Sequence, residues 1–507
     1  MLKKYKYQLI AAIVALLHLI ITFFCERKVF TLPPSANLPD YIICKLLAFF
    51  ILFGLYYGIC LIFFDKEKGA ELKKIVKWGL PYLPVMVIVT IFKLRNGFLS
   101  NDENLIYQNA QSLTHYTWFY YITTYYYIIS MMLIPFKYAA VVTKLIIEFL
   151  VIGYFTYNIS LIYGKKYGYF SYLLFLLYPM IAYTASAHRL PIYTFVYLYL
   201  FSTLYFDYQK ADPKASLFKS LSLKKELWLI FIAALLTQWR TEGIYLVLIS
   251  SILIIMVYGL YKNRKKTLMA LFLIVLCQYL VSVPQNGFVA KELGAAATDR
   301  MKPFYAYTVT NMFRNGLDRE KNKEDIELID KYLSIEKIDA INDYYKDINY
   351  EDVLILYADG FIGVREEADV TEYFNFAAAC KNLFINNPDV LLKTRWGAFL
   401  YAALPFKISF TGFGIKELLS FGLSVIKTLS YNLFIPVTVI AIVFIASLIK
   451  RRWFNFFTSA GLLCHLFIVF ILAPASYFKY YFPVYLMGYF YLMIFIMDFF
   501  YIRLKKR

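Results

Sequence analysis

Long, continuous apolar runs separated by short basic clusters constrain this chain more than any other feature. A run of about 20 apolar residues can cross a bilayer as a helix. Hydrophobic residues are 61% of the 507 residues and charged residues only 17%, more apolar surface than a water-soluble fold can bury. The runs do not alternate with a period of two, which excludes an outer-membrane barrel. The sequence therefore predicts an all-α polytopic membrane protein.

Counting the runs predicts about twelve transmembrane helices. They are residues 8–24, 41–64, 75–92, 138–162, 169–185, 190–206, 227–239, 243–261, 268–283, 429–449, 453–472 and 481–502. Basic clusters follow every second run, so the positive-inside rule places the N- and C-termini in the cytoplasm. Residues 118–136 do not fit this parity, and their many tyrosines predict an interfacial or re-entrant helix.

The predicted spans divide the chain into three parts. Residues 1–283 form a membrane domain whose outer loop 93–137 is the predicted catalytic loop. Residues 284–428 form one mainly helical extracytoplasmic domain, and residues 429–507 form the last membrane helices. The net charge of +19 lies in the clusters between spans, which indicates a lipid bilayer as partner and no nucleic acid. The composition and the short cytoplasmic loops favour a bacterial plasma membrane.

Two acidic residues in the first long outer loop are the first candidates for chemistry. Asp102 and Glu103 follow the third span and directly precede an amphipathic stretch, which places them at the membrane surface. A carboxylate there can take a proton from an acceptor hydroxyl. The alternative is that Asp102 caps the helix that comes next, and spacing alone favours this alternative.

Ionisable and aromatic residues near the outer ends of other spans form a second group of candidates. Cations there can hold the phosphate of a lipid donor. The alternative is that each cation snorkels to the headgroups, or that Arg240 pairs with Glu242. The group comprises His188, Arg189, Arg240, Glu242, Tyr477 and Lys479, with Arg95 and His115 in the first outer loop. Lys144 and Glu148, one helical turn apart within a span, are predicted to neutralise each other.

This layout resembles the GT-C class of integral-membrane glycosyltransferases, which includes protein O-mannosyltransferases and lipid A aminoarabinose transferases. Residues 100–107 resemble the acidic motif of that class, and residues 240–243 and 477–483 resemble two further motifs. The chain departs from the class because the acidic loop comes after the third span, whereas the class usually has it after the first. His115 also lacks the following proline, and residues 188–190 contain no acid.

The resemblance implies a glycosyltransferase that moves a sugar from a polyprenyl-phosphate-linked donor to an extracytoplasmic acceptor: a cell-envelope glycan, a lipid or a protein. Asp102 is then the base, with Glu103 in reserve, and Arg189, Arg240 and Lys479 hold the phosphate. The sequence assigns no cofactor with certainty and no metal ligand, and it leaves a divalent metal as a possibility. The alternatives are an envelope polysaccharide polymerase or ligase, and a non-enzymatic lipid or glycan flippase.

Overall fold

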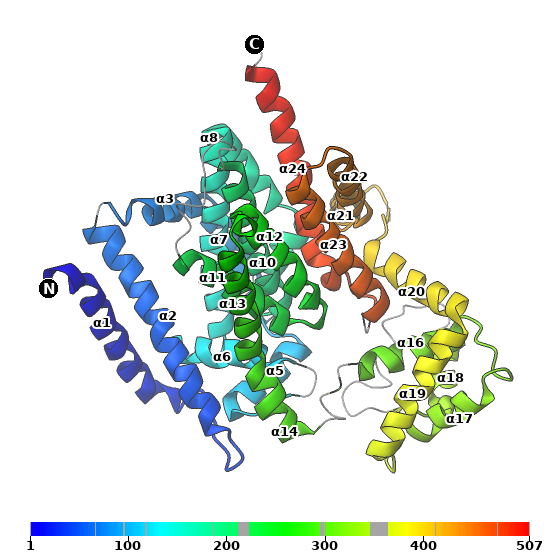
Figure 1. The fold of residues 1–507 in the computed structure, drawn as a ribbon. Helices are drawn as coiled ribbons and strands as arrows, with labels where there is room; N and C mark the ends of the chain where they lie inside the picture. The colour runs from blue at the N-terminus through cyan, green and yellow to red at the C-terminus, as the bar shows by residue number, and fades with distance from the viewer. Residues whose placement is uncertain are drawn as a thin grey trace. The chain divides into compact units, whose positions relative to one another are not determined.

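The structure, a computed structural model, is built from helices arranged in two compact units (Figure 1). It describes residues 2–65, 67–94, 97–116, 119–184, 186–210, 223–294, 299, 301–344, 363–410, 412–473 and 475–505. Within these residues the only extended pairing is one isolated bridge between Leu333 and Val364. The prediction of an all-α chain is confirmed for the part that the structure describes.

The first unit comprises Met1–Val289, Val439–Gly461 and Leu486–Arg507. Its own helices are α1 (Leu2–Glu26), α2 (Leu38–Phe64), α3 (Ala70–Gly79), α4 (Leu83–Leu94), α5 (Asn101–Ser112), α6 (Tyr121–Leu133), α7 (Ala139–Tyr163), α8 (Lys165–Phe170), α9 (Tyr178–Thr184), α10 (Arg189–Lys210), α11 (Leu223–Trp239), α12 (Leu246–Val257) and α13 (Arg264–Val283). Helices α1 and α2 pack along each other as a hairpin (Figure 1).

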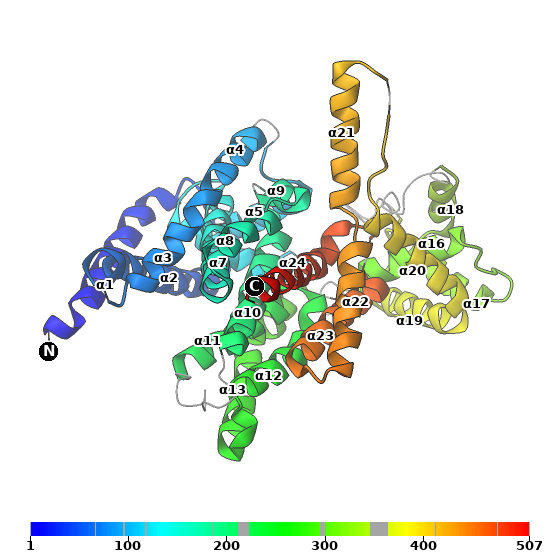
Figure 2. The same cartoon turned by 90° about the horizontal axis from the view of Figure 1, so that it is seen from above.

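The second unit comprises Ala290–Thr438 and Leu462–Tyr485. Its own helices are α14 (Ala290–Leu293), α16 (Lys302–Arg314), α17 (Lys323–Tyr332), α18 (Ile335–Tyr344), α19 (Val370–Asn386), α20 (Pro388–Ala403) and α21 (Ile415–Ser430). Three helices have residues in both units, namely α22 (Phe434–Ile449), α23 (Trp453–Leu472) and α24 (Phe482–Lys505). Within this unit α21 projects away from α16–α20 (Figure 2).

Eight helices among the described residues are long and apolar enough to cross a membrane. They are Tyr5–Glu26, Leu38–Phe64, Ala70–Leu94, Ala139–Tyr163, Arg264–Gly287, Ile415–Ile449, Trp453–Leu472 and Phe478–Tyr501. Each of them overlaps one of the twelve predicted spans, so helices long and apolar enough to cross a membrane are confirmed at eight of the predicted positions. The bounds differ most at the predicted span 429–449, where the candidate helix Ile415–Ile449 comprises α21 and α22. Several long apolar helices are the expected architecture of a multi-pass membrane protein.

The other four predicted spans differ from this pattern for identifiable reasons. The prediction of one helix over residues 169–185 is wrong, because a 3₁₀ turn separates α8 from α9. Helix α10 is long enough, but its tyrosines and hydroxyl residues make it less apolar, and most of its side chains are buried. Residues 227–239 belong to α11, which has only 17 residues. Residues 243–261 contain the short apolar helix Thr241–Val257, also of 17 residues, which consists of a 3₁₀ turn and α12.

Residues 118–136 contain α6, a helix of 13 residues. At about 1.5 Å per residue it is too short to cross a hydrocarbon core of about 30 Å. Ten of its residues are buried, among them Tyr121, Tyr125 and Tyr127, and it packs against α2, α5 and α7. These tyrosines therefore form part of the interior of the first unit, and the predicted lipid-facing belt is absent from the described part of α6.

A buried arginine joins two helices of the second unit. Arg395 on α20 is only 1% exposed, and its guanidinium donates to the carbonyl oxygens of Phe470 at 2.7 Å and Ala473 at 2.9 Å. These carbonyls lie at the end of α23, where the last turn of a helix leaves acceptors without backbone partners. A cation also compensates the negative end of the helix dipole, so Arg395 ties α20 to the end of α23.

Candidate active site

The acidic pair lies in the first turn of α5. Ser100 is the N-cap residue, in an extended conformation, and its hydroxyl donates to the carboxylate of Glu103. A serine N-cap with a glutamate three residues later is a common start signal for a helix, but here the Ser100 hydroxyl binds the Glu103 carboxylate and makes no cap hydrogen bond to the backbone. Glu103 is 1% exposed, whereas Asp102 is only half-buried. The alternative prediction that Asp102 is the cap is wrong, since Ser100 occupies that position.

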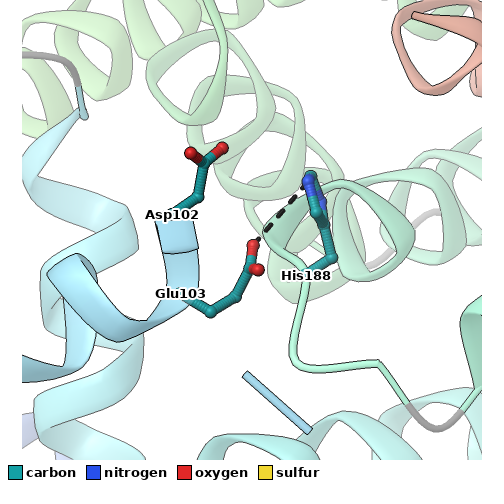
Figure 3. Close-up of side chains that lie close together, drawn as sticks. All are labelled: Asp102, Glu103 and His188. Carbon is teal, nitrogen blue, oxygen red and sulfur yellow. Dashed lines mark ion pairs between the residues drawn. The ribbon is translucent and has the colours of Figure 1, made fainter. Parts of the chain in front are cut away.

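The first turn of α10 brings a second pair to the same place. Nε2 of His188 lies 3.7 Å from Oε1 of Glu103 (Figure 3). One polar atom from each of Asp102, Glu103 and His188 lies within 4.8 Å of the other two. Arg189, the next residue, begins α10. Three of the predicted site residues, from segments far apart in the sequence, therefore meet where two helices begin, and Arg189 directly follows the third.

The tautomer of His188 is determined by its surroundings. The backbone N–H of Leu190 donates to Nδ1 of His188 at 3.2 Å. A ring nitrogen that accepts a hydrogen bond carries no proton, so Nε2 holds the proton of the neutral ring. A metal ion needs an unprotonated ring nitrogen. The Nε2 atom that faces Glu103 is therefore set up to interact with a carboxylate, and it does not fit a metal ligand in this arrangement.

Helix α6 supports the loop that carries His188. The hydroxyl of Tyr127 donates to the carbonyl oxygen of Ala187 at 3.1 Å, and the N–H of Ala187 donates to the carbonyl oxygen of Phe98 at 3.3 Å. Burial raises the pKa of the Tyr127 hydroxyl, as do the charges of Glu103 and Asp102, while the charge of Arg189 lowers it. The buried hydroxyl thus stays protonated as a donor, and charges of both signs lie near it.

An aromatic ring holds the cation of the site. The guanidinium carbon of Arg189 lies 4.0 Å from the centre of the Phe119 ring. Such a cation–π contact is an established way to fix an arginine in a partly dry environment. Arg189 is half-buried, as is Asp102. The guanidinium of Arg189 therefore has a defined orientation on the Phe119 ring.

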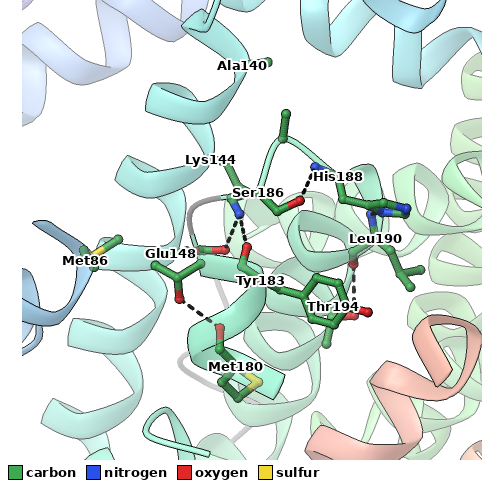
Figure 4. A network of polar contacts seen from close by, with 12 residues as sticks. Met86, Ala140, Lys144, Glu148, Met180, Tyr183, Ser186, His188, Leu190 and Thr194 are labelled. Atoms are coloured by element: carbon green, nitrogen blue, oxygen red, sulfur yellow. Dashed lines mark hydrogen bonds and ion pairs between the residues drawn. The ribbon is translucent and has the colours of Figure 1, made fainter. Parts of the chain in front are cut away.

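A buried ion pair anchors the segment that leads to His188 (Figure 4). Nζ of Lys144 on α7 lies 3.3 Å from Oε1 of Glu148 and donates to the carbonyl oxygen of Tyr183 at 2.5 Å. Farther along, the N–H of His188 donates to Oγ of Ser186 at 3.1 Å. The predicted pairing of Lys144 with Glu148 is confirmed. Lys144 additionally holds the end of α9, shortly before the loop of the site.

Arg240 and Glu242 form a buried pair with each other. Nε of Arg240 donates to Oε1 of Glu242, and the two residues are 8% and 9% exposed. The sequence allowed two interpretations of Arg240, and the pairing with Glu242 is the one confirmed. The charge of Arg240 is thus matched within the chain.

His115 belongs to a different buried cluster. Its Nε2 lies 2.6 Å from Oδ2 of Asp40, and the hydroxyl of Tyr125 donates to Oδ1 of Asp40 at 2.5 Å. Burial and the hydrogen bond to Asp40 raise the pKa of the Tyr125 hydroxyl, so it remains a donor. His115 comes after the end of α5, whereas Asp102 lies at its start, a helix of 12 residues away. The structure therefore does not bring His115 to the acidic pair.

Arg95, Tyr477 and Lys479 complete the set of predicted site residues. Arg95 lies outside the described residues. Tyr477 and Lys479 belong to the second unit, where Nζ of Lys479 lies 4.4 Å from the centre of the Tyr477 ring. They form a cation–π pair at the start of the 3₁₀ turn Phe478–Tyr481.

Comparison with family models, with curated proteins and with solved structures finds no match for this chain. The function is therefore inferred from the site itself.

Three residues of these clusters were missed by sequence reasoning, namely Asp40, Tyr125 and Tyr127. Asp40 carried a usable signal, because an acidic residue after Leu38-Pro39 opens an otherwise apolar helix and is costly to bury without a partner. The two tyrosines carried none. They are two among 48 tyrosines, and only the packing of α6 distinguishes them.

Proposed function

We propose that this chain is a membrane glycosyltransferase of the GT-C type, which moves a sugar from a polyprenyl-phosphate-linked donor to an extracytoplasmic acceptor. The observation that supports it is the cluster of Asp102, Glu103 and His188 at the starts of α5 and α10, with Arg189 as the next residue in the chain. Transfer from a lipid phosphate requires a base for the acceptor hydroxyl and a cation for the leaving phosphate. The first turns of two helices also supply backbone N–H groups that favour an anion.

The proposed reaction is a single displacement at the anomeric carbon of the sugar. The carboxylate of Asp102 takes the proton of the acceptor hydroxyl, and the hydroxyl oxygen forms a bond to that carbon. The bond between the carbon and the phosphate oxygen breaks, and polyprenyl phosphate leaves with the electron pair. Arg189 stabilises the negative charge that develops on the phosphate. The products are the glycosylated acceptor, polyprenyl phosphate and a protonated Asp102.

Burial distinguishes the two carboxylates. Glu103 is buried, accepts from Ser100 and faces His188, so it orders the meeting of α5 with α10. Asp102 is half-buried and is therefore the carboxylate that an acceptor can reach. We assign the base to Asp102 and a positioning role to Glu103. Arg240 is not assigned to the phosphate, because Glu242 already neutralises it.

The finer topology belongs to the same proposal. Twelve spans are reached when α10, α11, the helix Thr241–Val257 and the broken segment of α8 and α9 cross the bilayer alongside the eight long helices. In this topology both termini are cytoplasmic and residues 284–428 form an extracytoplasmic domain. A bacterial plasma membrane provides polyprenyl-phosphate donors and envelope acceptors on the required side.

The proposed function is tested by incubating the purified full chain in lipid vesicles with radiolabelled polyprenyl-phosphate sugars. We expect one of the sugars to be released slowly to water or transferred to an added acceptor, with production of polyprenyl phosphate. An unchanged donor with every sugar and every acceptor contradicts the proposal. Movement of the intact labelled lipid between leaflets, without cleavage, indicates a flippase.

Arg189→Gln should weaken recognition of the phosphate specifically. A charge-assisted hydrogen bond contributes roughly 1.5–3 kcal/mol, so inhibition by polyprenyl phosphate should need about 10- to 100-fold more inhibitor. Inhibition by the uncharged polyprenol should be unchanged. The matched control is Arg452→Gln, at an exposed arginine after α22. This control should leave the inhibition constants of polyprenyl phosphate and of polyprenol unchanged. Equal weakening of both inhibitors would mean that Arg189 shapes the site without binding phosphate.

A further inference from the structure

Helix α21 carries an unusually complete division between an apolar and a polar face. Its apolar residues recur every three or four positions, which is the spacing of one helical face. The exposed ones are Ile415, Leu418, Leu419, Leu423, Ile426 and Leu429, while the apolar residues Phe421 and Val425 are half-buried. Polar residues occupy the opposite side, namely Lys416, Glu417, Ser420, Ser424, Lys427 and Thr428.

The apolar face is exposed along its whole length. The six apolar side chains are between 45% and 82% exposed, and no residue of α21 is buried. By contrast, α16, α19 and α20 of the same unit all contain buried apolar residues. Figure 2 shows α21 projecting from these helices. A contiguous apolar face of this kind on a folded protein marks a contact with another apolar phase.

The segment before α21 extends the same surface. The ring of Phe410 packs against two other rings, with its centre 5.5 Å from that of Phe421 and 5.1 Å from that of Phe413. The side chain of Ser424 is hydrogen-bonded to the backbone of Ser409 on the polar side. Phe413 itself is 86% exposed. The helix therefore packs against residues that precede it, and these residues add aromatic side chains near its N-terminal end.

The composition of α22, the next helix in the chain, indicates that the apolar face of α21 contacts lipid. Helix α22 begins shortly after α21 ends and contains no charged residue. The two helices together form the candidate span Ile415–Ile449, whose 35 residues exceed the roughly 20 that one crossing needs. The unpartnered face is thus continuous with a segment that is apolar on every side. We infer that α21 lies in the plane of a lipid bilayer surface, with its apolar face in the acyl chains and its polar face toward water.

The charges of α21 argue against the alternative that it crosses the membrane together with α22. A crossing α21 would bring Lys416, Glu417 and Lys427 close to the hydrocarbon core, where charged groups are costly. Lying in the plane, the same residues stay among headgroups, and the lysines can contact lipid phosphates. The inference does not depend on the proposed function or on the side of the membrane.

Spin labels at single cysteines test the inference in the full chain, with the six native cysteines replaced by serine, in vesicles of phosphatidylethanolamine and phosphatidylglycerol. Labels at Leu419 and Ile426 should be relaxed more by oxygen, which partitions into lipid, than by a water-soluble nickel chelate. Labels at Ser420 and Ser424 should show the reverse preference. A label at Ile442, exposed on α22, is the control for a residue at greater depth in the bilayer.

Depth along the helix separates the possible outcomes. For a helix in the plane, labels at Ile415, Leu419 and Ile426 should report the same depth, shallower than the label at Ile442. A steady change of depth from Ile415 to Ile426 would show that α21 crosses the bilayer and overturn the inference. Preference for nickel at every position would place α21 in water, and dipolar broadening at Leu419 would indicate a second copy of the chain on this face. Either result also overturns it.

Discussion

Asp102→Asn is expected to reduce the rate of sugar transfer by about 10²–10⁴-fold, the usual contribution of a general base. Asparagine has nearly the same shape but cannot accept the proton of the acceptor hydroxyl. The change should leave the affinity for the donor within a few-fold of the native value, because Arg189, the proposed phosphate ligand, is unchanged. Single-turnover transfer from a radiolabelled donor measures the rate, and inhibition by polyprenyl phosphate reports the affinity.

Loss of folding is separated from loss of chemistry by two controls. Asp102 lies in the first turn of α5, and a charge there contributes only about 0.3–1 kcal/mol to helix stability. Asp389→Asn makes the same change in the first turn of α20, at an exposed aspartate, and should leave transfer unchanged. Thermal unfolding of both variants should stay close to that of the native chain.

The companion variant Glu103→Gln decides between the two carboxylates. Glu103 keeps its hydrogen bond from Ser100 as a glutamine but loses its charge toward His188. If Glu103 positions the loop, its variant should lose less activity than Asp102→Asn. Full activity of Asp102→Asn removes Asp102 from the mechanism, and a greater loss in Glu103→Gln moves the base to the buried residue.

Sequence periodicity was sufficient for the parts of the fold that depend on local composition. The all-helical class and eight apolar helices follow from long apolar runs, which are typical of helices that cross a bilayer. Where the runs are rich in tyrosine, as in α6 and α10, apolar length does not predict whether the helix crosses the membrane. Tyrosine suits both a membrane interface and a protein interior, and only packing decides which one a given residue occupies.

The site was predictable as a set of residues but not as an arrangement. Asp102, Glu103, His188 and Arg189 were each selected because they are ionisable at the end of an apolar run, and the structure brings the side chains of the first three together, with Arg189 next in the chain. The same criterion also selected His115, which the structure pairs with Asp40 instead. Which ionisable groups meet depends on contacts between distant segments, and one sequence contains no measure of those distances.

The second large effect concerns the ion pair that anchors the site. Lys144→Met should lower the free energy of unfolding by about 3–5 kcal/mol, because it leaves a buried carboxylate without its cation. Lys144 and Glu148 are 1% and 0% exposed, so water cannot compensate the charge of Glu148. The carbonyl oxygen of Tyr183 also loses its donor. Chemical denaturation of the purified chain in detergent measures the change.

The double variant Lys144→Met/Glu148→Leu shows whether the loss comes from the uncompensated charge. Replacing both members of a buried pair by apolar residues is often close to neutral, so the double variant should recover most of the stability that the single variant loses. Lys68→Met is the matched control, since Lys68 is 71% exposed and its pair with Asp65 at 3.6 Å should contribute at most about 1 kcal/mol. A double variant as unstable as Lys144→Met would instead assign the loss to the Tyr183 contact, and no loss in the single variant would mean that the pair is reached by water.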